Sequence, residues 1–442
     1  MYAIRKGEHV LKIRAALILM AMLLAANAFA VVCVPAQEGA VLLTDAGVPV
    51  ELLRKYDAIN PLGAGLLAAK HAGAYALMNE AGAELTSPVY THLRCEEDIL
   101  LAEYGGFWGM LDTNGAPLCE FEYTWILPTG AGNCWALRGD PNDNESDELF
   151  LLDASGAEST TGIFVRRFAR EAGDGLLALQ PSGQAYFGYC DANGNIVIPA
   201  QYASAGTFAN GIAPAVRNGK FGIITPDGKN LLPFEYDFIE LSQNAGCIAA
   251  KDEHGVYMFA ASGEKLAEYP GAHLQAGFIG NCFMLYDGAS MRLYDPDGAL
   301  RHMLSPETAV SLGVDDALIF ADGAWGESCV WLEGTQEKYQ HLYPLGKIDG
   351  EALYACMKVN VARYMNDLLG EIQLSTDMDS ARWGVVDAHG KLLLDCVYDS
   401  VEIAGGKLLV QREGLWQLIS PDGTIHWEET MPEAESSSEA GS

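Results

Sequence analysis

Two stretches of the chain are near copies of each other: FGYCDANGNIVIPAQY at residues 187–202 and FGIITPDGKNLLPFEY at residues 221–236. At matching offsets, each has an aromatic residue followed by glycine, an acidic turn that ends in glycine, an apolar run with a proline, and a tyrosine. Self-similarity at a period of roughly 20 to 50 residues is the signature of a repeat architecture.

The turn glycine marks about eleven units along the chain, most of them 33 to 41 residues apart. It recurs at Gly47, Gly82, Gly115, Gly156, Gly194, Gly228, Gly263, Gly298, Gly334, Gly390 and Gly423. Two further markers keep the same register. An aromatic residue follows the turn glycine by eight positions at Tyr90, Tyr123, Phe164, Tyr202, Tyr236 and Tyr398. An aromatic–glycine pair precedes the turn at Trp108-Gly109, Phe187-Gly188, Phe221-Gly222 and Trp383-Gly384.

One unit shows how the repeat should fold. GIAPAV (211–216) predicts a short strand, and RNGK (217–220) predicts a tight hairpin turn because asparagine and glycine tolerate positive φ. FGIIT (221–225) and NLLPFEY (230–236) predict two further strands on either side of the turn PDGK (226–229). Such an antiparallel meander cannot bury both of its faces alone, so it needs neighbouring units stacked on it.

This pattern of residues resembles the WG-repeat family of bacterial proteins. The resemblance is strongest over residues 187–240, partial over 108–123 and 383–400, and weaker over most of 41–427. The aromatic–glycine pair is replaced at Tyr75-Ala76, Tyr257-Met258 and Trp416-Gln417. The resemblance implies a β-rich repeat scaffold, and it implies no catalytic residues because the signature positions are structural.

We therefore expect an all-β protein of about eleven antiparallel β-meander repeats of roughly 35 residues each. Units of this size suit the blades of a propeller-like ring, and they also suit an open curved array. Residues 41–427 are predicted to form this repeat domain, as one array or as two sub-arrays.

The N-terminus has the layout of a secretory signal peptide, predicted to span residues 1–30. The basic stretch MYAIRKGEHVLKIR precedes the apolar run AALILMAMLLAANAFA, and Ala28-Phe29-Ala30 fits the small-x-small cleavage pattern. Two alternatives remain: the apolar run, which continues to Val34, could stay as a membrane anchor, or Cys33 could carry a lipid. All three place the remaining chain outside the cytoplasm, so we expect an extracellular or cell-surface protein. It would meet the membrane only through an uncleaved N-terminal segment.

The composition excludes one class of partner. The formal net charge is −32, from 59 acidic and 27 basic residues. A surface this acidic repels phosphate backbones, so we expect no nucleic-acid partner.

The ten cysteines include no C-x-x-C pair, which argues against zinc-ribbon and thioredoxin sites. Many of them lie inside apolar runs, where cysteine acts as a small core residue. One or two disulfides among the ten would be compatible with this spacing.

Three segments interrupt the repeat. RGDPNDNESDE, residues 138–148, lengthens one hairpin, and residues 360–381 lengthen another. Within the second, VARYMNDLLGEI (361–372) is predicted to form a helical turn or two. Residues 428–442, EETMPEAESSSEAGS, are an acidic, serine-rich tail that we expect to be disordered. Insertions in repeat arrays often carry the binding surface, so residues 138–148 and 360–381 are the expected places for a site.

The recurring polar and aromatic residues have a structural interpretation and a functional one. The turn aspartates could be catalytic or bind metal, but aspartate at the start of a turn also accepts backbone hydrogen bonds, and a catalytic residue is needed only once. These aspartates are Asp112, Asp153, Asp191 and Asp387. We expect them to be structural, and we expect the recurrent aromatics to pack in the core rather than to stack on sugars. Aromatics off the signature positions are better candidates for an exposed binding face: Trp125, Trp325 and Tyr364.

The sequence predicts no dedicated metal, cofactor or catalytic site. Asp140, Asn142 and Asn144 match the first three ligand positions of an EF-hand loop, but Glu145 and Leu151 stand where that loop needs glycine and glutamate. The weak metal candidates that remain are Asp140, Asp143, Asp147 and Glu148. The nine histidines show no ligand spacing, and no nucleophile elbow, Walker loop or dinucleotide fingerprint is present.

These observations favour an exported, non-enzymatic repeat scaffold that binds an unknown protein or glycan ligand at the bacterial cell surface or outside the cell. One alternative is a structural spacer of the envelope, for which we expect an elongated shape. Another is an enzyme with a pocket between repeats, for which we expect a convergent cluster of polar residues that breaks the repeat pattern.

Overall fold

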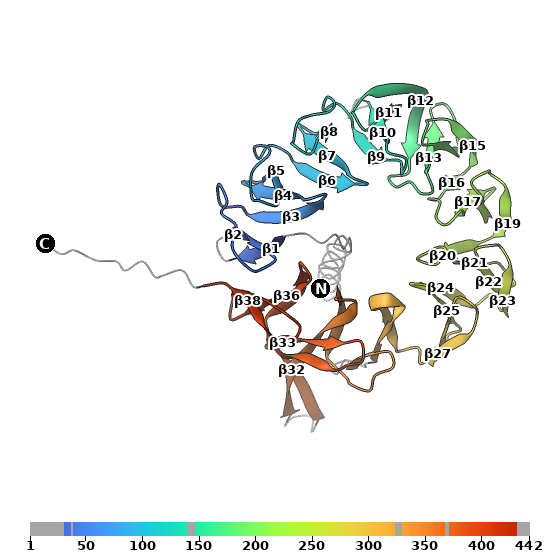
Figure 1. Ribbon diagram of the computed structural model, residues 1–442. Helices are drawn as coiled ribbons and strands as arrows, with labels where there is room; N and C mark the ends of the chain where they lie inside the picture. The colour runs from blue at the N-terminus through green and yellow to red at the C-terminus, as the bar shows by residue number, and fades with distance from the viewer. Residues whose placement is uncertain (1–30, 37–38, 140–146, 323–328, 367–370, 431–442) are drawn as a thin grey trace.

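The computed structural model describes residues 31–36, 39–139, 147–322, 329–366 and 371–430 (Figure 1). These residues form strands, turns and one 3-10 segment, η1 (Val314–Asp316), with no α-helix among them. Within this part of the chain, no helix is long and apolar enough to cross a membrane. The protein is therefore all-β, as the alternation of short apolar runs and glycine turns predicts.

The strands form ten antiparallel sheets. The strands of the first five units are β1 (Val31–Ala36), β2 (Gly39–Thr44); β3 (Ala58–Gly63), β4 (Leu66–His71), β5 (Ala74–Asn79); β6 (His92–Glu96), β7 (Ile99–Tyr104), β8 (Phe107–Leu111); β9 (Trp125–Pro128), β10 (Cys134–Arg138), β11 (Asp147–Leu152), β12 (Glu158–Phe168), β13 (Leu176–Pro181), β14 (Phe187–Asp191) and β15 (Ile196–Tyr202).

The remaining six units follow in the same order. Their strands are β16 (Ser204–Ala205), β17 (Ala213–Arg217), β18 (Lys220–Ile224), β19 (Asn230–Tyr236); β20 (Phe238–Leu241), β21 (Cys247–Lys251), β22 (Gly255–Ala260), β23 (Lys265–Pro270); β24 (Gln275–Ile279), β25 (Cys282–Tyr286), β26 (Met291–Tyr294), β27 (Leu300–Leu304); β28 (Ala309–Leu312), β29 (Leu318–Asp322), β30 (Cys329–Leu332); β31 (His341–Ile348), β32 (Glu351–Asn366), β33 (Glu371–Asp387), β34 (Leu392–Tyr398); β35 (Ser400–Ala404), β36 (Lys407–Arg412), β37 (Leu415–Ile419) and β38 (Ile425–Glu428).

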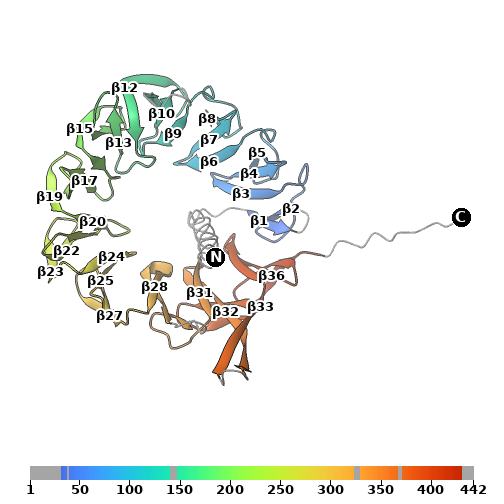
Figure 2. The same ribbon diagram turned by 180° about the vertical axis from the view of Figure 1, so that it is seen from behind.

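Each unit is one blade, with its first strand toward the centre of the ring and its last strand toward the outside (Figures 1 and 2). The seven-stranded sheet contains two blades, because β12 pairs with β11 at one end and with β13 at the other. Strand β12 is thus both the last strand of blade 4 and the first strand of blade 5. Ten sheets, one of them double, make the eleven blades that the turn glycines predict.

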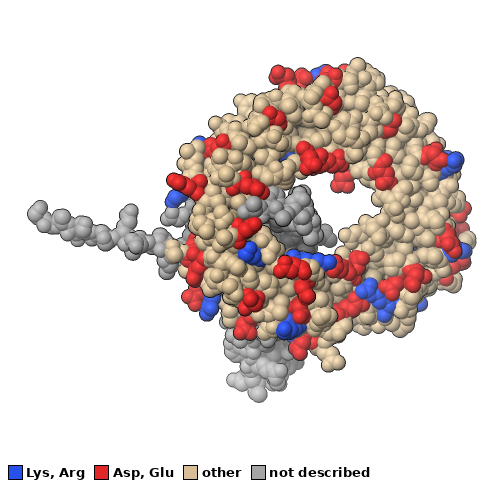
Figure 3. Space-filling model, in the orientation of Figure 1, with Lys and Arg blue, Asp and Glu red and all other residues tan. Residues whose placement is uncertain are grey.

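The eleven blades form one closed ring (Figure 1). Val32 and Leu43 of blade 1 share a buried apolar cluster with Leu409 and Leu418 of blade 11, so the two ends of the array pack directly together. The space-filling view shows an opening at the centre of this ring, and acidic side chains scattered over the visible face (Figure 3). Among the described residues, no strand of blade 1 pairs with a strand of blade 11, so the two ends of the array meet through side-chain packing.

The turn glycine is the joint between consecutive blades. All eleven have positive φ, and most of them lie close to the outermost segment of the preceding blade, which is either its last strand or the residues after its turn glycine. A Cβ on Gly115 would lie 2.3 Å from Thr86 Cγ2, and one on Gly156 would lie 2.4 Å from the Leu118 carbonyl oxygen. At the seam of the ring, a Cβ on Gly47 would lie 2.4 Å from the His426 carbonyl oxygen in blade 11. The interface between blades 11 and 1, which closes the ring, therefore has the same kind of glycine contact as most interfaces between consecutive blades.

Two features differ from the sequence prediction: where the array begins, and the conformation of the described residues within 361–372. The array begins at Val31 rather than at residue 41, because β1 pairs with β2 in the first blade; its apolar residues read in sequence as a continuation of the preceding run. The helical turn predicted in residues 361–372 is wrong for the described residues, since β32 and β33 continue as a long hairpin in which Val361 pairs with Thr376 and Asn366 with Glu371. Cross-strand pairing outweighs the local helical pattern there.

Candidate functional site

The turn aspartates hold their own turns, as predicted. In each case one carboxylate oxygen accepts the backbone N–H groups two and four residues further on. The Oδ1 of Asp191 accepts from Asn193 at 2.9 Å and from Asn195 at 2.8 Å. Asp112, Asp153 and Asp387 make the same pair of bonds in their own turns. The bond from the Ala116 N–H and its neighbours lowers the pKa of Asp112 below its ordinary value. These carboxylates are occupied by the backbone and are not a repeated catalytic group.

Replacing Asp191 with alanine should lower the free energy of unfolding by about 1–2 kcal/mol, because it removes two hydrogen bonds to a charged acceptor. Asp191→Asn keeps a neutral oxygen in the same place and should lose less. Urea unfolding of the two variants measures the difference.

The pKa of Asp191 is lowered, because the backbone hydrogen bonds outweigh the effect of burial. Its stabilisation is therefore present at neutral pH and is lost as the pH falls through the folded pKa. Equal losses in both variants at pH 7 would contradict this role.

The aromatic–glycine pair is a packing device. The outermost strand of the blade crosses over the glycine, so that a Cβ on Gly222 would lie 2.9 Å from Phe234 Cδ1, and one on Gly188 would lie 2.4 Å from the Ile198 carbonyl oxygen. Glycine at these positions gives the neighbouring strand room to approach. The recurrent aromatics are half-buried beside the core, as the sequence predicts, and Trp383 packs edge-on against Tyr343.

Three buried tyrosines, Tyr56, Tyr123 and Tyr339, each connect their blade to the following one through the hydroxyl group. Tyr56 donates to Glu84, Tyr123 donates to Glu158 at 2.6 Å, and Tyr339 donates to the Gly390 carbonyl oxygen at 3.3 Å. Burial and the bond to Glu158 raise the pKa of Tyr123 far above its ordinary value, so the hydroxyl stays protonated as a donor.

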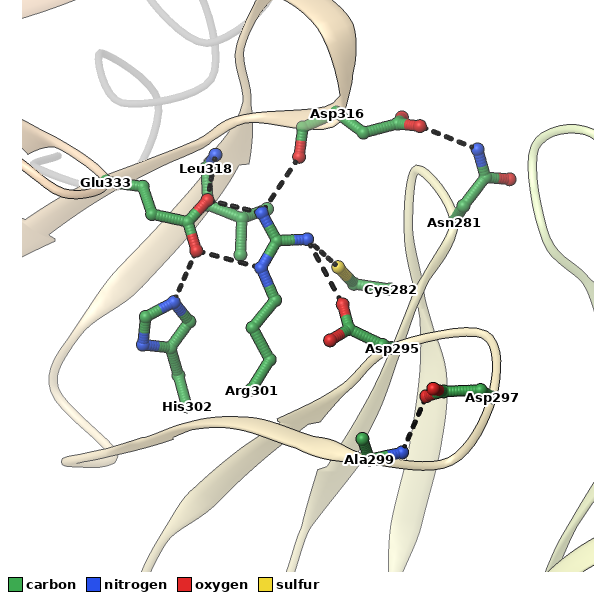
Figure 4. A network of polar contacts seen from close by, with 10 residues as sticks. All are labelled: Asn281, Cys282, Asp295, Asp297, Ala299, Arg301, His302, Asp316, Leu318 and Glu333. Atoms are coloured by element: carbon green, nitrogen blue, oxygen red, sulfur yellow. Dashed lines mark hydrogen bonds and ion pairs between the residues drawn. The ribbon is translucent and has the colours of Figure 1, made fainter. Parts of the chain in front are cut away.

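A convergent polar network lies between blades 8 and 9 (Figure 4). Arg301, on β27, donates from Nε to Oε1 of Glu333 at 2.8 Å and from Nη2 to the other carboxylate oxygen. His302 also contacts this carboxylate, and the Leu318 backbone N–H donates to it at 3.2 Å. Arg301 further reaches Cys282 Sγ at 3.1 Å and Asp295 at 3.5 Å. The sequence analysis did not find this network, because its members have no motif spacing.

The network replaces the regular joint between blades. A Cβ on Gly334 would meet nothing within 4 Å, so the usual glycine contact with the preceding blade is missing there. Glu333, the residue before it, makes the connection instead. Burial alone would raise the pKa of Glu333, but the bonds from Arg301 and His302 outweigh it and lower the pKa. A carboxylate occupied by four donor groups has no free oxygen for acid–base chemistry, so the network stabilises the ring.

Of the weak metal candidates, only Asp147 and Glu148 lie in the described part of the chain. Asp140 and Asp143 lie outside the described residues. Asp147 and Glu148 are neighbours on β11 and point to opposite faces of the sheet. Asp147 accepts from the Thr124 hydroxyl at 3.4 Å, and Glu148 accepts from the Thr160 hydroxyl at 2.9 Å. Across the described part of the chain, no group of three or more histidine, cysteine, aspartate or glutamate side chains could hold a metal ion.

The off-signature aromatics give a mixed result. Trp125 packs on Phe168, with ring centroids 4.8 Å apart, and belongs to the core of blades 4 and 5. Trp325 and the side chain of Tyr364 lie outside the part of the structure that is described.

One aromatic at a repeat position, Phe164, is exposed, and it lines a shallow groove of mixed polar and apolar character. The pairing of β12 with β11 skips residues between Thr160 and Ile163, where Gly162 has positive φ. This bulge leaves Phe164 50% exposed and buries Val165 in its place. The repeat register marks Phe164 correctly as an aromatic position, but it does not decide whether that side chain is buried. The groove has a volume of about 540 Å³ and is lined by residues of β12, β15 and the β13–β14 turn.

The groove adjoins a basic segment in an acidic protein. Arg166, Arg167 and Arg170 follow Phe164 on β12 and in the loop after it, and all three are exposed. No ion pair within the described residues involves them, whereas most other described arginines are paired with a carboxylate. We call Phe164, the groove and these three arginines the β12 surface. It combines apolar contact area with unpaired positive charge.

Antiparallel blades stacked around one axis and joined through repeated turn residues define a propeller-like repeat scaffold. The model of the family described as the WG containing repeat matches residues 187–221, 221–253 and 383–416. The chain thus contains WG repeats at these positions, as the aromatic–glycine spacing indicates.

Comparisons with other proteins add little about activity. No curated protein matches the chain. Among solved structures, the crystal structure of a eukaryotic initiation factor is 12% identical, with a TM-score of 0.39, over 71% of this chain and 96% of that chain. Apo AztD from Citrobacter koseri is 10% identical, with a TM-score of 0.30, over 62% of this chain and 94% of that chain. Similarities this low support no inference about function.

Proposed function

We propose that this ring is an exported, non-enzymatic scaffold that binds an acidic ligand, a protein segment or a charged glycan, at the cell surface or outside the cell. The β12 surface is the observation that carries the proposal. Residues that contribute most of the binding energy in protein interfaces are enriched in aromatic side chains and arginine. The β12 surface exposes both kinds of side chain next to each other. Arginine also pairs well with carboxylates because its planar fork can donate two parallel hydrogen bonds.

The use of the polar residues favours binding over catalysis. The turn aspartates bond to their own backbone, Tyr56, Tyr123 and Tyr339 bond to the next blade, and the Arg301–Glu333 pair joins blades 8 and 9. An enzyme needs acidic or histidine side chains with unoccupied atoms gathered in a pocket, and the turn aspartates and Glu333 are not free for that role. The closed ring also favours a binding scaffold over a spacer, which would need an elongated array.

Export is supported by the position of β1. Removal of residues 1–30 would leave Val31 at the start of the mature chain, where it pairs with Thr44 in the first blade. Lipid attachment to Cys33 fits less well. It would remove Val31 and Val32, and Cys33 is half-buried within β1, where desolvation raises the pKa of the thiol to about 12.

The proposal is tested by binding of the labelled protein to intact bacteria that produce it. Phe164→Ser combined with Arg167→Glu should weaken binding about tenfold or more, because loss of a desolvated anchor typically costs over 1–2 kcal/mol. Added salt should weaken binding of the wild type more than that of the variant, since the arginine contribution is screened. Met303→Ser combined with Arg412→Glu changes exposed residues of the same types elsewhere, and it should bind like the wild type.

A second variant examines the long hairpin. Lys358 pairs with Arg382 across β32 and β33, so residues 359–381 can be replaced by Asn-Gly. The result, Lys-Asn-Gly-Arg, copies the two-residue turn at Arg217–Lys220 in blade 6. The shortened protein should fold and bind as before. If it alone loses binding while the Phe164 variant retains it, the β12 surface is not the binding face.

A further inference from the structure

The glycine of the Trp383-Gly384 pair lies between two cysteines. Cys356, on β32, is the register partner of Gly384 on β33. Cys396 comes from β34 on the other side, and its Sγ lies 3.7 Å from that of Cys356. A Cβ on Gly384 would lie 2.9 Å from Cys396 Sγ and 2.6 Å from the Leu394 carbonyl oxygen. Only the absence of a side chain at Gly384 lets the two thiols meet over the middle strand.

Other blades place a different pair in this position. There, an inner-strand residue opposite the glycine and an outer-strand residue that crosses over it form a small and a larger partner. These pairs are Ala102 with Phe121, Leu179 with Ala200, and Ala215 with Phe234. Blade 10 instead has two side chains of equal size whose reactive atoms touch. The space over the glycine is thus filled by a pair that can form a covalent bond.

We infer that Cys356 and Cys396 form a disulfide that ties β32 to β34 across β33. The sulfur atoms must move from 3.7 Å to the bonded distance of about 2 Å. Because β33 lies between β32 and β34, β34 must also shift toward β32 when the bond forms. The bond would enclose residues 357–395, including the whole long hairpin, and would hold the outer strand at the base of that hairpin. It goes beyond the proposed binding function, because it concerns blade 10 and needs no ligand.

The two thiols have different access to an oxidant. Cys396 is half-buried on the outer strand, whereas Cys356 is fully buried. With a disulfide oxidant such as oxidised glutathione, the Cys396 thiolate attacks one glutathione sulfur, forms a mixed disulfide and releases one glutathione thiolate. The Cys356 thiolate then attacks the Cys396 sulfur and releases the second glutathione. Two electrons pass from the cysteines to the oxidant, and the two thiol protons end on the glutathione thiolates or in solvent.

Mass spectrometry of the oxidised protein tests the inference. The purified, reduced protein is incubated with oxidised glutathione, its remaining thiols are blocked with N-ethylmaleimide in denaturant, and it is digested without reductant. The expected product is a cross-linked peptide pair containing Cys356 and Cys396, lighter than the sum of the two peptides by two hydrogen atoms and separated by reductant. If both thiols are blocked by N-ethylmaleimide, or if either is joined to another cysteine, the inference is wrong.

Single variants test the order of the steps. Cys356→Ser should leave Cys396 trapped as a mixed disulfide with glutathione, whereas Cys396→Ser should leave Cys356 unmodified because it is buried. Cys190→Ser, at a buried thiol on β14, should leave the cross-linked peptide unchanged. In urea, the oxidised wild type should unfold at a higher concentration than the reduced wild type. The Cys356→Ala/Cys396→Ala protein should show no such shift, and a shift of equal size in that variant would overturn the inference.

Discussion

Gly47→Ala should destabilise the protein far more than the same substitution at Gly298. Both residues occupy the same place in the turn, with φ of 78° and 85°, so alanine costs about 1–2 kcal/mol at each site from backbone strain alone. At Gly298 a Cβ would meet nothing within 4 Å. At Gly47 it would lie 2.4 Å from the His426 carbonyl oxygen, so the backbone of blade 11 must move. We expect an additional loss of about 1–3 kcal/mol at Gly47, the usual cost of overpacking.

Urea unfolding of the two variants measures this difference, and Gly298→Ala serves as the control for backbone strain. Because Gly47 lies at the seam between the first and last blades, its substitution should also loosen the ring. Small-angle scattering should then show a larger radius of gyration for Gly47→Ala than for Gly298→Ala. Equal losses of stability and equal radii would mean that the seam is not held by this contact.

The second large effect is expected at Glu333. Glu333→Ala removes the partner of Arg301, His302 and the Leu318 N–H at once, while the Arg301 and Glu333 side chains are only 23% and 19% exposed. Removing one partner of a well-buried pair typically costs about 3–5 kcal/mol, and partial exposure reduces the expected loss to roughly 2–3 kcal/mol. Arg301 keeps its contact with Asp295 at 3.5 Å, which is too long to replace the pair.

The control for Glu333 is an exposed ion pair. Lys265 and Glu268 lie 2.6 Å apart on β23 with about half of each side chain exposed, so Glu268→Ala should change stability little. Thermal or urea unfolding of both variants gives the comparison. A loss at Glu333 no greater than the loss at Glu268 would show that the network does not join blades 8 and 9.

The Glu333 contribution should also depend on pH. Because the folded pKa of Glu333 is lowered, its stabilisation is complete above the unfolded value of about 4.3 and is lost as the pH falls through the folded pKa. The difference in unfolding free energy between the wild type and Glu333→Gln should therefore shrink as the solution is acidified. A difference that stays constant from pH 7 to about pH 3 would argue against a charged Glu333 in the folded ring.

Much of the fold was predictable because the signals are local. The turn glycines adopt positive φ, the turn aspartates accept backbone hydrogen bonds within four residues, and Asn218-Gly219 forms the tight hairpin between β17 and β18. Each of these depends on residues that are close in sequence, so their spacing identifies the blades. Where a local irregularity intervened, the spacing did not decide burial: the bulge at Gly162 turned Phe164 outward, although its spacing from Gly156 matches the repeat.

The chemically distinctive features depend on residues far apart in the chain. Arg301 and Glu333 are 32 positions apart and meet because consecutive blades stack, and Cys356 meets Cys396 because both strands flank Gly384. No spacing in the chain predicts these contacts, since they depend on which side chains face each other across a blade or between two blades.

The repeating unit and its number are thus encoded by the residues themselves, because tight turns and strand alternation are properties of short segments. Closure of the array was decided only by the tertiary structure. Whether eleven blades meet as a ring depends on the angle between neighbours summed around the whole array, and a small change at each joint would leave it open. Gly47 lies against His426, nearly four hundred residues further along the chain, and this contact is part of the interface that closes the ring.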